Sequence, residues 1–134
     1  MTHEGLTGGC LCGSVRYRAR GEARDLCFCH CASCRRASGG AMVPWATFDA
    51  DAFTVEHGHL ATFASSPPVT RGFCATCGTT LTYAHSSLPG EIDVTIASLD
   101  DPAVLTPACH IWVRDKLPSV VLGDGLPAHD TVRK

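Results

Sequence analysis

The sequence predicts an irregular, mainly β fold of many short strands, and two observations support this. Short segments in which apolar and polar residues alternate recur along the chain, and a period of two is typical of strands with one buried face. Eight of the nine cysteines lie in three tight groups, and two groups are followed at once by a glycine, Gly13 or Gly78, that allows the backbone to turn sharply. Only one short segment favours a helix.

Two strands are expected directly after these turns. Residues 14–19, SVRYRA, and residues 79–84, TTLTYA, share one layout, and each run ends with a tyrosine and an alanine. Residues 91–96, EIDVTI, also alternate between polar and apolar. Because proline donates no backbone hydrogen bond, Pro44 favours an edge strand or a bulge for its own run. Further apolar or β-branched runs predict strands at 41–48, 53–57, 59–64 and 110–115.

The helical candidate is ASCRRAS, residues 32–38, and Gly39 and Gly40 are expected to end it. The last segment, GDGLPAHDTVRK, contains glycine and proline and is expected to wrap over the surface. The chain contains no linker-like or low-complexity segment. We therefore expect a single domain spanning residues 1–134.

The composition excludes several classes of partner. The net charge of −2 and the pI near 6.3 argue against nucleic acid or a membrane surface, since phosphate binding normally requires a basic face. No apolar run is long enough to span a bilayer, and the N-terminal residues lack the features of a signal peptide. We therefore expect a cytoplasmic protein. That compartment is reducing, so nine cysteines favour metal binding over disulfides. An odd number of cysteines also could not all pair in disulfides.

Two cysteine pairs predict a closed metal site. Cys10 and Cys12 form a C-x-C, and Cys74 and Cys77 form a C-x-x-C. Two tight turns that each offer two sulfurs, far apart in sequence, are what a tetrahedral site of four cysteines requires. Such a site binds zinc and stabilises the fold.

The third group lies in CFCHCASCRR and contains Cys27, Cys29, Cys31 and Cys34. In an extended strand, Cys27, Cys29 and Cys31 would stand about 6.6 Å apart in successive steps, too far to share one metal without a turn. The residues alone leave three possibilities. They are an open site of Cys29, Cys31 and Cys34, a closed site with Cys27 or His30 as fourth ligand, and an empty or oxidised site.

The ordered motifs resemble one known family. The segments that carry the resemblance are GGCLCGSVRY, CHCASCRRASGG, RGFCATCGTTL, HIWVRDKLP and DGLP. Together they are similar to the glutathione-dependent formaldehyde-activating enzymes, a family of S-(hydroxymethyl)glutathione synthase-like proteins that includes relatives of centromere protein V. The resemblance implies several short coiled β-sheets pinned by zinc knuckles. It also implies two zinc ions per chain, a structural one on Cys10, Cys12, Cys74 and Cys77 and a catalytic one on Cys29, Cys31 and Cys34.

Three protein ligands with an open fourth position form the catalytic arrangement of zinc. A thiol that binds there loses its proton, and the thiolate is the nucleophile that adds to an aldehyde. The resemblance therefore implies a zinc-dependent carbon–sulfur lyase or synthase that acts on a thiol–aldehyde adduct such as S-(hydroxymethyl)glutathione, with glutathione as the small-molecule partner. Two other functions remain open: a non-catalytic, zinc-stabilised interaction module and a thiol redox sensor.

A few further residues have a specific expectation. Arg35 is a candidate for binding a substrate carboxylate, and His110 is a candidate for lining the site. Cys109 is expected to be a small buried apolar residue rather than a ligand. Ser119 follows a K-x-P element, at a position where relatives of the family often carry tryptophan. The residue at this position is expected to help form the wall of the active site, so the departure bears on the substrate preference. The aromatic residues expected in the core are Phe48, Phe73, Trp45 and Trp112.

Overall fold

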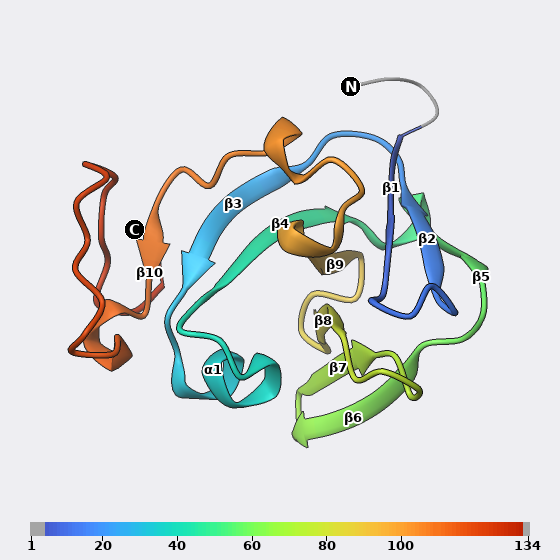
Figure 1. Cartoon of the computed structure of the whole chain (residues 1–134), viewed down its shortest axis with the longest axis horizontal. Coiled ribbons are helices and arrows are strands. Elements are labelled where there is room, and N and C mark those ends of the chain that lie inside the picture. The colour runs from blue at the N-terminus through green and yellow to red at the C-terminus, as the bar shows by residue number, and fades with distance from the viewer. Residues whose placement is uncertain (1–4, 133–134) are drawn as a thin grey trace.

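The structure is a computed structural model that describes residues 5–132. It is mainly β, as the sequence predicts, and has two sheets (Figure 1). The smaller sheet has the order β1-β2-β5 and is antiparallel. Its strands are β1 (Leu6–Gly9), β2 (Arg16–Ala19) and β5 (Phe53–His57).

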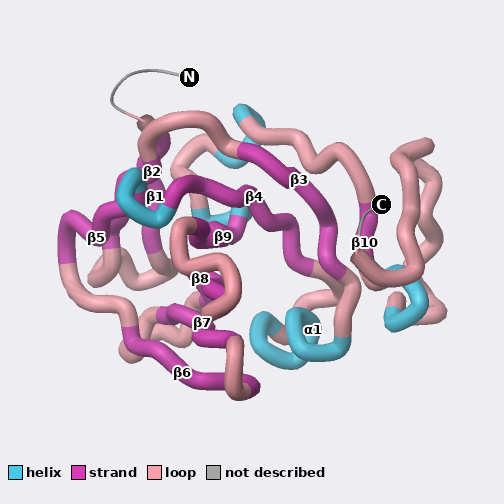
Figure 2. The backbone as a smooth tube through the Cα atoms, turned by 180° about the vertical axis from the view of Figure 1, so that it is seen from behind, coloured by secondary structure: helices cyan, strands magenta, loops and turns pink. Residues whose placement is uncertain are grey.

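The larger sheet has the order β10-β3-β4-β9-β8-β7-β6, and only the β10–β3 pair is parallel. The first two described strands, β1 and β2, belong to the small sheet, and between β4 and β6 the chain leaves the large sheet once to add β5 to the small one (Figure 2). Its strands are β3 (Arg24–Cys29), β4 (Val43–Asp49), β6 (Ala61–Ser66), β7 (Val69–Phe73), β8 (Thr80–His85), β9 (Glu91–Thr95) and β10 (His110–Ile111).

The helix α1 (Ala32–Ser38) has the predicted bounds. Its N-cap is Cys31, whose sulfur accepts the amide of Cys34, and it ends at Gly39 with a φ of 72°. Short 3₁₀ turns complete the helical structure of residues 5–132. They are η1 (Ala50–Ala52), η2 (Ile96–Ser98), η3 (Pro102–Val104) and η4 (Val113–Asp115).

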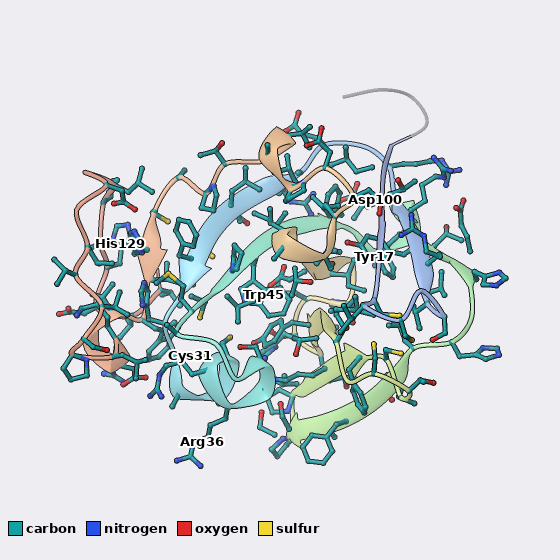
Figure 3. All side chains as sticks on the ribbon, viewed as in Figure 1. Tyr17, Cys31, Arg36, Trp45, Asp100 and His129 are labelled. Atoms are coloured by element: carbon teal, nitrogen blue, oxygen red, sulfur yellow. The ribbon has the colours of Figure 1, made fainter. Side chains whose placement is uncertain are left out.

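Two separate groups of buried apolar residues form the core. The first joins the two sheets, because Tyr17 of the small sheet packs with Phe48, Leu81 and Val94 of the large one. The second lies toward α1 and β10 and is centred on Trp45 and four cysteines. Each group contains one cluster of cysteine sulfurs, and Figure 3 shows the sulfur atoms gathered in two separate places.

Several expectations about individual strands were wrong in detail. The run 110–115 forms a strand only at His110–Ile111, because Trp112 takes a left-handed conformation with a φ of 57° and starts the turn η4. The strand expected at 59–64 begins two residues later, at Ala61. The sequence analysis did not predict β1, β3 or β7.

The sequence favoured an edge strand or a bulge around Pro44, but β4 lies inside the large sheet between β3 and β9. Proline is tolerated in this inner strand because Pro44 lies before the point where pairing with β9 begins. Pro44 pairs with Phe28 of β3, whereas pairing with β9 starts at Trp45. At Pro44 itself the strand therefore has a neighbour on one side only.

The final segment packs as the sequence predicts. His110 donates its amide to the carbonyl of Pro127, and Trp112 donates to that of Thr131. These hydrogen bonds fix the tail against β10, while residues 133–134 lie outside the described part. Within residues 5–132 no helix has the length and apolar character required to cross a membrane.

Candidate metal centre

The outer cluster, defined as Cys10, Cys12, Cys74 and Cys77, is held by two similar turns. In each turn the first cysteine donates its amide to the carbonyl five residues later, at 3.1 Å for Cys10 and 3.0 Å for Cys74. Both turns close through a glycine, Gly13 or Gly78, with a φ of 81°. Only glycine adopts this conformation without strain, and the predicted role of the two glycines is confirmed.

The sulfurs of the outer cluster fit a tetrahedral metal. All four lie within 4.8 Å of one another, with 3.6 Å between Cys10 and Cys12 and 3.8 Å between Cys12 and Cys74. Two sulfurs that share a zinc ion at about 2.3 Å each, at a tetrahedral angle, stand about 3.8 Å apart. The donor set and its spacing therefore agree with one zinc ion held by four thiolates.

Hydroxyl and amide groups favour the anionic form of Cys77 and Cys10. For Cys12 the contacts with Ser14 lower the pKa, but burial and the sulfurs of the neighbouring cysteines outweigh them and raise it. The Thr79 hydroxyl lies 3.1 Å from the Cys77 sulfur and lowers the pKa of Cys77 to about 5. Burial raises the pKa of Cys10, but the Val15 amide at 3.2 Å and neighbouring side chains outweigh it and bring the pKa to about 7. Thiolates are the form that binds metal.

The inner cluster, defined as Cys29, Cys31 and Cys34, forms where β3 turns into α1. Cys29 ends β3, Cys31 caps α1, and Cys34 lies in its first turn. This turn brings the three sulfurs within 4.8 Å of one another. Cys27 remains on β3 and, like His30, is not part of the cluster. Among the described residues, the cluster therefore offers no support for a closed site with Cys27 or His30 as the fourth ligand.

The inner sulfurs cannot all lose their protons without a cation. Contacts with Cys31 and then Cys34, together with burial, raise the pKa of Cys29 far above its ordinary value. Contacts with Cys29 and then Cys34 lower the pKa of Cys31 far below its ordinary value. For Cys34 the contact with Cys29 lowers the pKa, but the contact with Cys31 and burial outweigh it and raise the pKa. A divalent ion removes this conflict because it stabilises every thiolate it binds. The inner cluster therefore also has the chemistry of a metal site.

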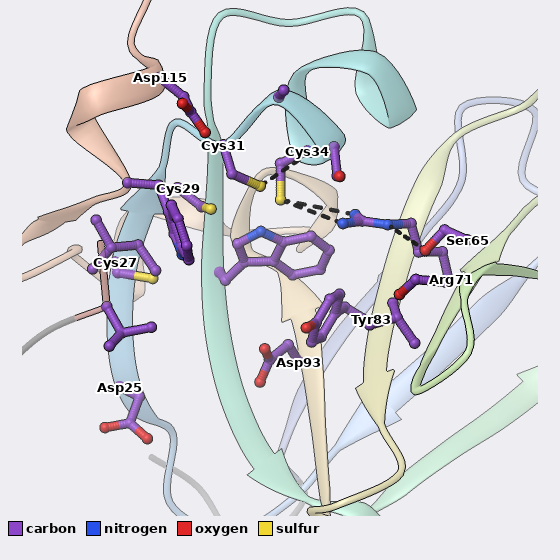
Figure 4. A pocket seen from close by; sticks show the side chains of 18 of the residues that line it. Asp25, Cys27, Cys29, Cys31, Cys34, Ser65, Arg71, Tyr83, Asp93 and Asp115 are labelled. Carbon is purple, nitrogen blue, oxygen red and sulfur yellow. Dashed lines mark hydrogen bonds between the residues drawn. The ribbon is translucent and has the colours of Figure 1, made fainter. Parts of the chain in front are cut away.

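The inner cluster faces a cavity of about 430 Å³, which lies in the usual range for small-molecule sites (Figure 4). Its apolar wall contains Trp45, Tyr83 and Trp112, and the outer cluster does not contribute to it. Trp45 is 4% exposed and belongs to the core as predicted. Trp112 is only half-buried, and besides packing on the second core it lines the cavity, a role that the core interpretation missed.

Two of the lining residues have an unusual backbone. Asp25 and Trp112 are the non-glycine residues with positive φ in the described chain, at 55° and 57°. Asp25 sits where the pairing of β3 with β4 is irregular, and Trp112 ends β10. Such conformations cost free energy and gather at functional sites, which supports the cavity as the site.

Arg71 is a cavity residue that the sequence analysis did not weigh. It lies on β7 and is only 7% exposed, and both terminal nitrogens of its guanidinium are 3.8 Å from the Cys34 sulfur. Figure 4 shows it reaching toward Cys34 and Ser65. No local signal indicated this position, since Arg71 stands three residues before Cys74, which belongs to the outer cluster.

His110 is not among the residues that line the cavity. Its Nε2 is 2.7 Å from the Asp124 carboxylate and its Nδ1 is 2.8 Å from Nε2 of His30. Burial, followed by the nearby His110, lowers the pKa of His30. The chain of side chains from Asp124 to His30 therefore fixes the peptide segment between Cys29 and Cys31, and substrate binding by His110 stays a prediction.

Three further residues singled out in the sequence, Arg35, Ser119 and Cys109, are not among those that line the cavity. Arg35 belongs to the last turn of α1 and is not among the lining residues, so its substrate role also stays a prediction. Ser119 is exposed and does not line the cavity either. Cys109 is 6% exposed and packs in the second core, as expected, and lies outside both sulfur clusters.

Comparison with known proteins confirms the family resemblance. Residues 5–115 match the sequence profile of the family described as glutathione-dependent formaldehyde-activating enzyme. Because this match covers most of the chain, the protein belongs to that family.

Two individual proteins are also similar to this chain. A Schizosaccharomyces pombe protein described as an uncharacterized lyase is 31% identical over 80 residues, which are 60% of this chain but only 58% of that relative. A crystal structure of a Rhodobacter sphaeroides protein has a TM-score of 0.60, covers 92% of this chain and 99% of its own, and is 24% identical. The latter supports the fold alone.

Proposed function

We propose that this protein is a zinc-dependent carbon–sulfur lyase or synthase that acts on a thiol–aldehyde adduct such as S-(hydroxymethyl)glutathione. The observation that carries the proposal is the position of the inner cluster, with three cysteine sulfurs at a cavity of about 430 Å³. Membership of the family supports glutathione as the thiol and formaldehyde as the aldehyde. The outer cluster, with four sulfurs and no part in the cavity, has the composition of a structural site.

Zinc held by Cys29, Cys31 and Cys34 would supply an open fourth position at which a thiol loses its proton. The reaction then joins the thiol sulfur to the carbonyl carbon, and the aldehyde oxygen takes up a proton to give the hemithioacetal. In the lyase direction the carbon–sulfur bond breaks, and the hydroxyl proton leaves as the carbonyl forms. The reaction changes no oxidation state, so it requires neither an oxidant nor a reductant.

The chain's own residues hold and enclose the reactants. The ring systems of Trp45, Tyr83 and Trp112 form an apolar wall that excludes water from the sulfur. Arg71 presents a fixed positive charge beside Cys34. Holding thiol and aldehyde together in one orientation lowers the entropic part of the barrier.

The direct test is a glutathione titration of cobalt-loaded protein. Thiolate-to-cobalt charge-transfer bands report each new sulfur bond, and glutathione should strengthen them in the wild type but not in Cys34→Ser. Cys109→Ala serves as the matched control, because it removes a buried cysteine outside both clusters. If millimolar glutathione changes none of these spectra, the interaction-module alternative replaces the enzyme.

Turnover requires a separate measurement, because thiols add to formaldehyde without a catalyst. Exchange spectroscopy by NMR follows glutathione, formaldehyde and their adduct at equilibrium. The wild type and Cys109→Ala should accelerate the exchange above the rate without protein, and Cys34→Ser should not.

A further inference from the structure

Arg71 is a buried cation whose position requires an explanation. Its side chain enters from β7, next to Tyr83 in the pairing with β8, and 7% of the residue is exposed. Burying a guanidinium costs several kcal/mol unless an anion or strong acceptors compensate. None of the ion pairs found in residues 5–132 includes Arg71, so no carboxylate provides that compensation there.

The partners of Arg71 fix the orientation of its guanidinium. Its Nε donates to the Ser65 hydroxyl at 3.3 Å, and its carbon Cζ lies 5.1 Å from the centre of the Tyr83 ring. Both terminal nitrogens then point to the Cys34 sulfur at 3.8 Å. A planar guanidinium held on three sides in this way is pre-organised, which a lysine ammonium could not match.

Arg71 is also the one cationic side chain among the residues that line the described cavity. The other charged lining residues are Asp25, Asp93 and Asp115. A negatively charged ligand that enters the cavity therefore meets a single positive group, and that group lies at the inner cluster.

The net charge of a metal-bound inner cluster explains why a cation beside Cys34 is useful. Three thiolates on a divalent zinc ion leave one negative charge in excess, and a fourth thiolate would leave two. Adding the second negative charge in a partly buried site is unfavourable without a nearby cation. Arg71, beside Cys34, is placed to offset that charge.

We propose that Arg71 is the positioning residue that makes the open ligand position of the inner cluster selective for anionic ligands, thiolates above all, over neutral ones. The proposal rests on the proposed function in one respect, namely that a metal ion occupies the inner cluster. It assigns to Arg71 the preference of the site for a thiolate, and it does not depend on which thiol is the substrate.

The test compares anionic and neutral ligands of the cobalt-loaded protein. Dissociation constants for azide, 2-mercaptoethanol and imidazole are measured from the visible spectrum in the wild type, Arg71→Lys and Arg71→Met. Charge-assisted hydrogen bonds contribute about 1.5–3 kcal/mol, so Arg71→Met should weaken azide and the thiol by about tenfold or more. Imidazole, being neutral, should change by less than about threefold, and Arg71→Lys should lie between wild type and Arg71→Met.

A merely structural role for Arg71 predicts a different pattern, in which all three ligands weaken together. That result overturns the proposal, as does an unchanged affinity for the anions in Arg71→Met. A wild-type site that binds none of the three ligands overturns it too, since it then has no open position. Cobalt content and far-UV circular dichroism show that each variant is folded and loaded.

If Arg71→Met does not fold, Arg71→Gln replaces it, because glutamine is neutral and keeps a polar group near Ser65. The ratio of the anion affinity to the imidazole affinity then tests the role of Arg71 in the same way. Failure of the proposed function has a separate signature. In that case glutathione leaves the wild-type spectrum unchanged while azide still binds, and the azide-to-imidazole ratio still tests Arg71.

Discussion

The outer and inner cysteine clusters offer the same side chain in different surroundings, and these surroundings suit them to different purposes. The outer cluster joins two turns more than sixty residues apart in sequence, and hydroxyl and amide groups surround its four sulfurs. The inner cluster comes from six consecutive residues and offers three sulfurs beside a cavity and a buried arginine. A closed set of ligands far apart in sequence stabilises a fold, whereas an open local set beside a cavity can bind a further ligand.

The two clusters also differ in how they connect the molecule. Cys10 and Cys74 belong to the first core, which joins the small and large sheets. In addition, the amide of Leu11 in one turn donates to the Thr79 hydroxyl of the other at 3.0 Å. The inner cluster, by contrast, lies at the junction of one strand and one helix. Loss of the outer metal should therefore affect the whole fold, and loss of the inner metal should affect the site.

The largest effect expected from this comparison is that of Cys74→Ser. Structural zinc contributes about 10 kcal/mol or more of apparent binding free energy, which is comparable to the whole stability of a small domain. The variant should be insoluble or unfolded by circular dichroism, whereas the control Cys109→Ala should remain folded. Soluble Cys74→Ser protein with an unchanged melting temperature would contradict a structural role for the outer cluster.

Cys34→Ser should have an intermediate effect. Because the outer cluster keeps its four sulfurs, we expect a folded protein that has lost one of its two equivalents of zinc. Metal analysis and a thermal melt measure both quantities on the same sample. If the variant loses all its zinc, or unfolds as Cys74→Ser does, the two clusters do not differ in the way proposed.

A smaller effect is expected from the double change Cys27→Ala and Cys109→Ala. Both residues are buried, at 3% and 6% exposure, and lie outside the two clusters. Removing each sulfur should cost about 1 kcal/mol of packing, because the cavity left is small. The zinc content should stay at the wild-type value. A loss of one equivalent from Cys27→Ala alone would support a closed inner site with Cys27 as the fourth ligand.

The smallest effect concerns an ion pair near the outer cluster. Arg16 and then Thr7 bind the Asp100 carboxylate and lower the pKa of Asp100 to about 2. A carboxyl group with a lowered pKa stabilises the fold above its unfolded pKa near 3.8, and this contribution is lost as the pH falls toward 2. Both side chains are more than a third exposed, so solvent screening limits the contribution to about 1 kcal/mol or less.

Asp100→Asn should therefore lower the free energy of unfolding slightly at pH 7. The difference from wild type should shrink between pH 4 and pH 2, in denaturant titrations at each pH. Since the ion pair contributes so much less than a metal site, the outer region should depend on its cysteines first. An effect of Asp100→Asn as large as that of Cys74→Ser would reverse this ranking.

The sequence by itself determined the β class, the helix at residues 32–38 and the grouping of the cysteines. These features are local, since alternation, a capping residue and a glycine with positive φ act within a few positions. The pairing of Cys10–Cys12 with Cys74–Cys77 was also predictable, because a tetrahedral site requires four ligands and the residues offered two matching pairs.

Only the tertiary structure decided which side chains accompany the inner cluster. Arg71 comes from β7, Trp45 from β4 and Asp25 from an irregular position in β3, and nothing in their local sequence indicates that they share one cavity. Their meeting depends on strand order and register, which depend on packing across the whole sheet. The surroundings of His110 depend on the tertiary structure in the same way: its strand pairs in parallel with β3, and its side chain contacts His30 and Asp124.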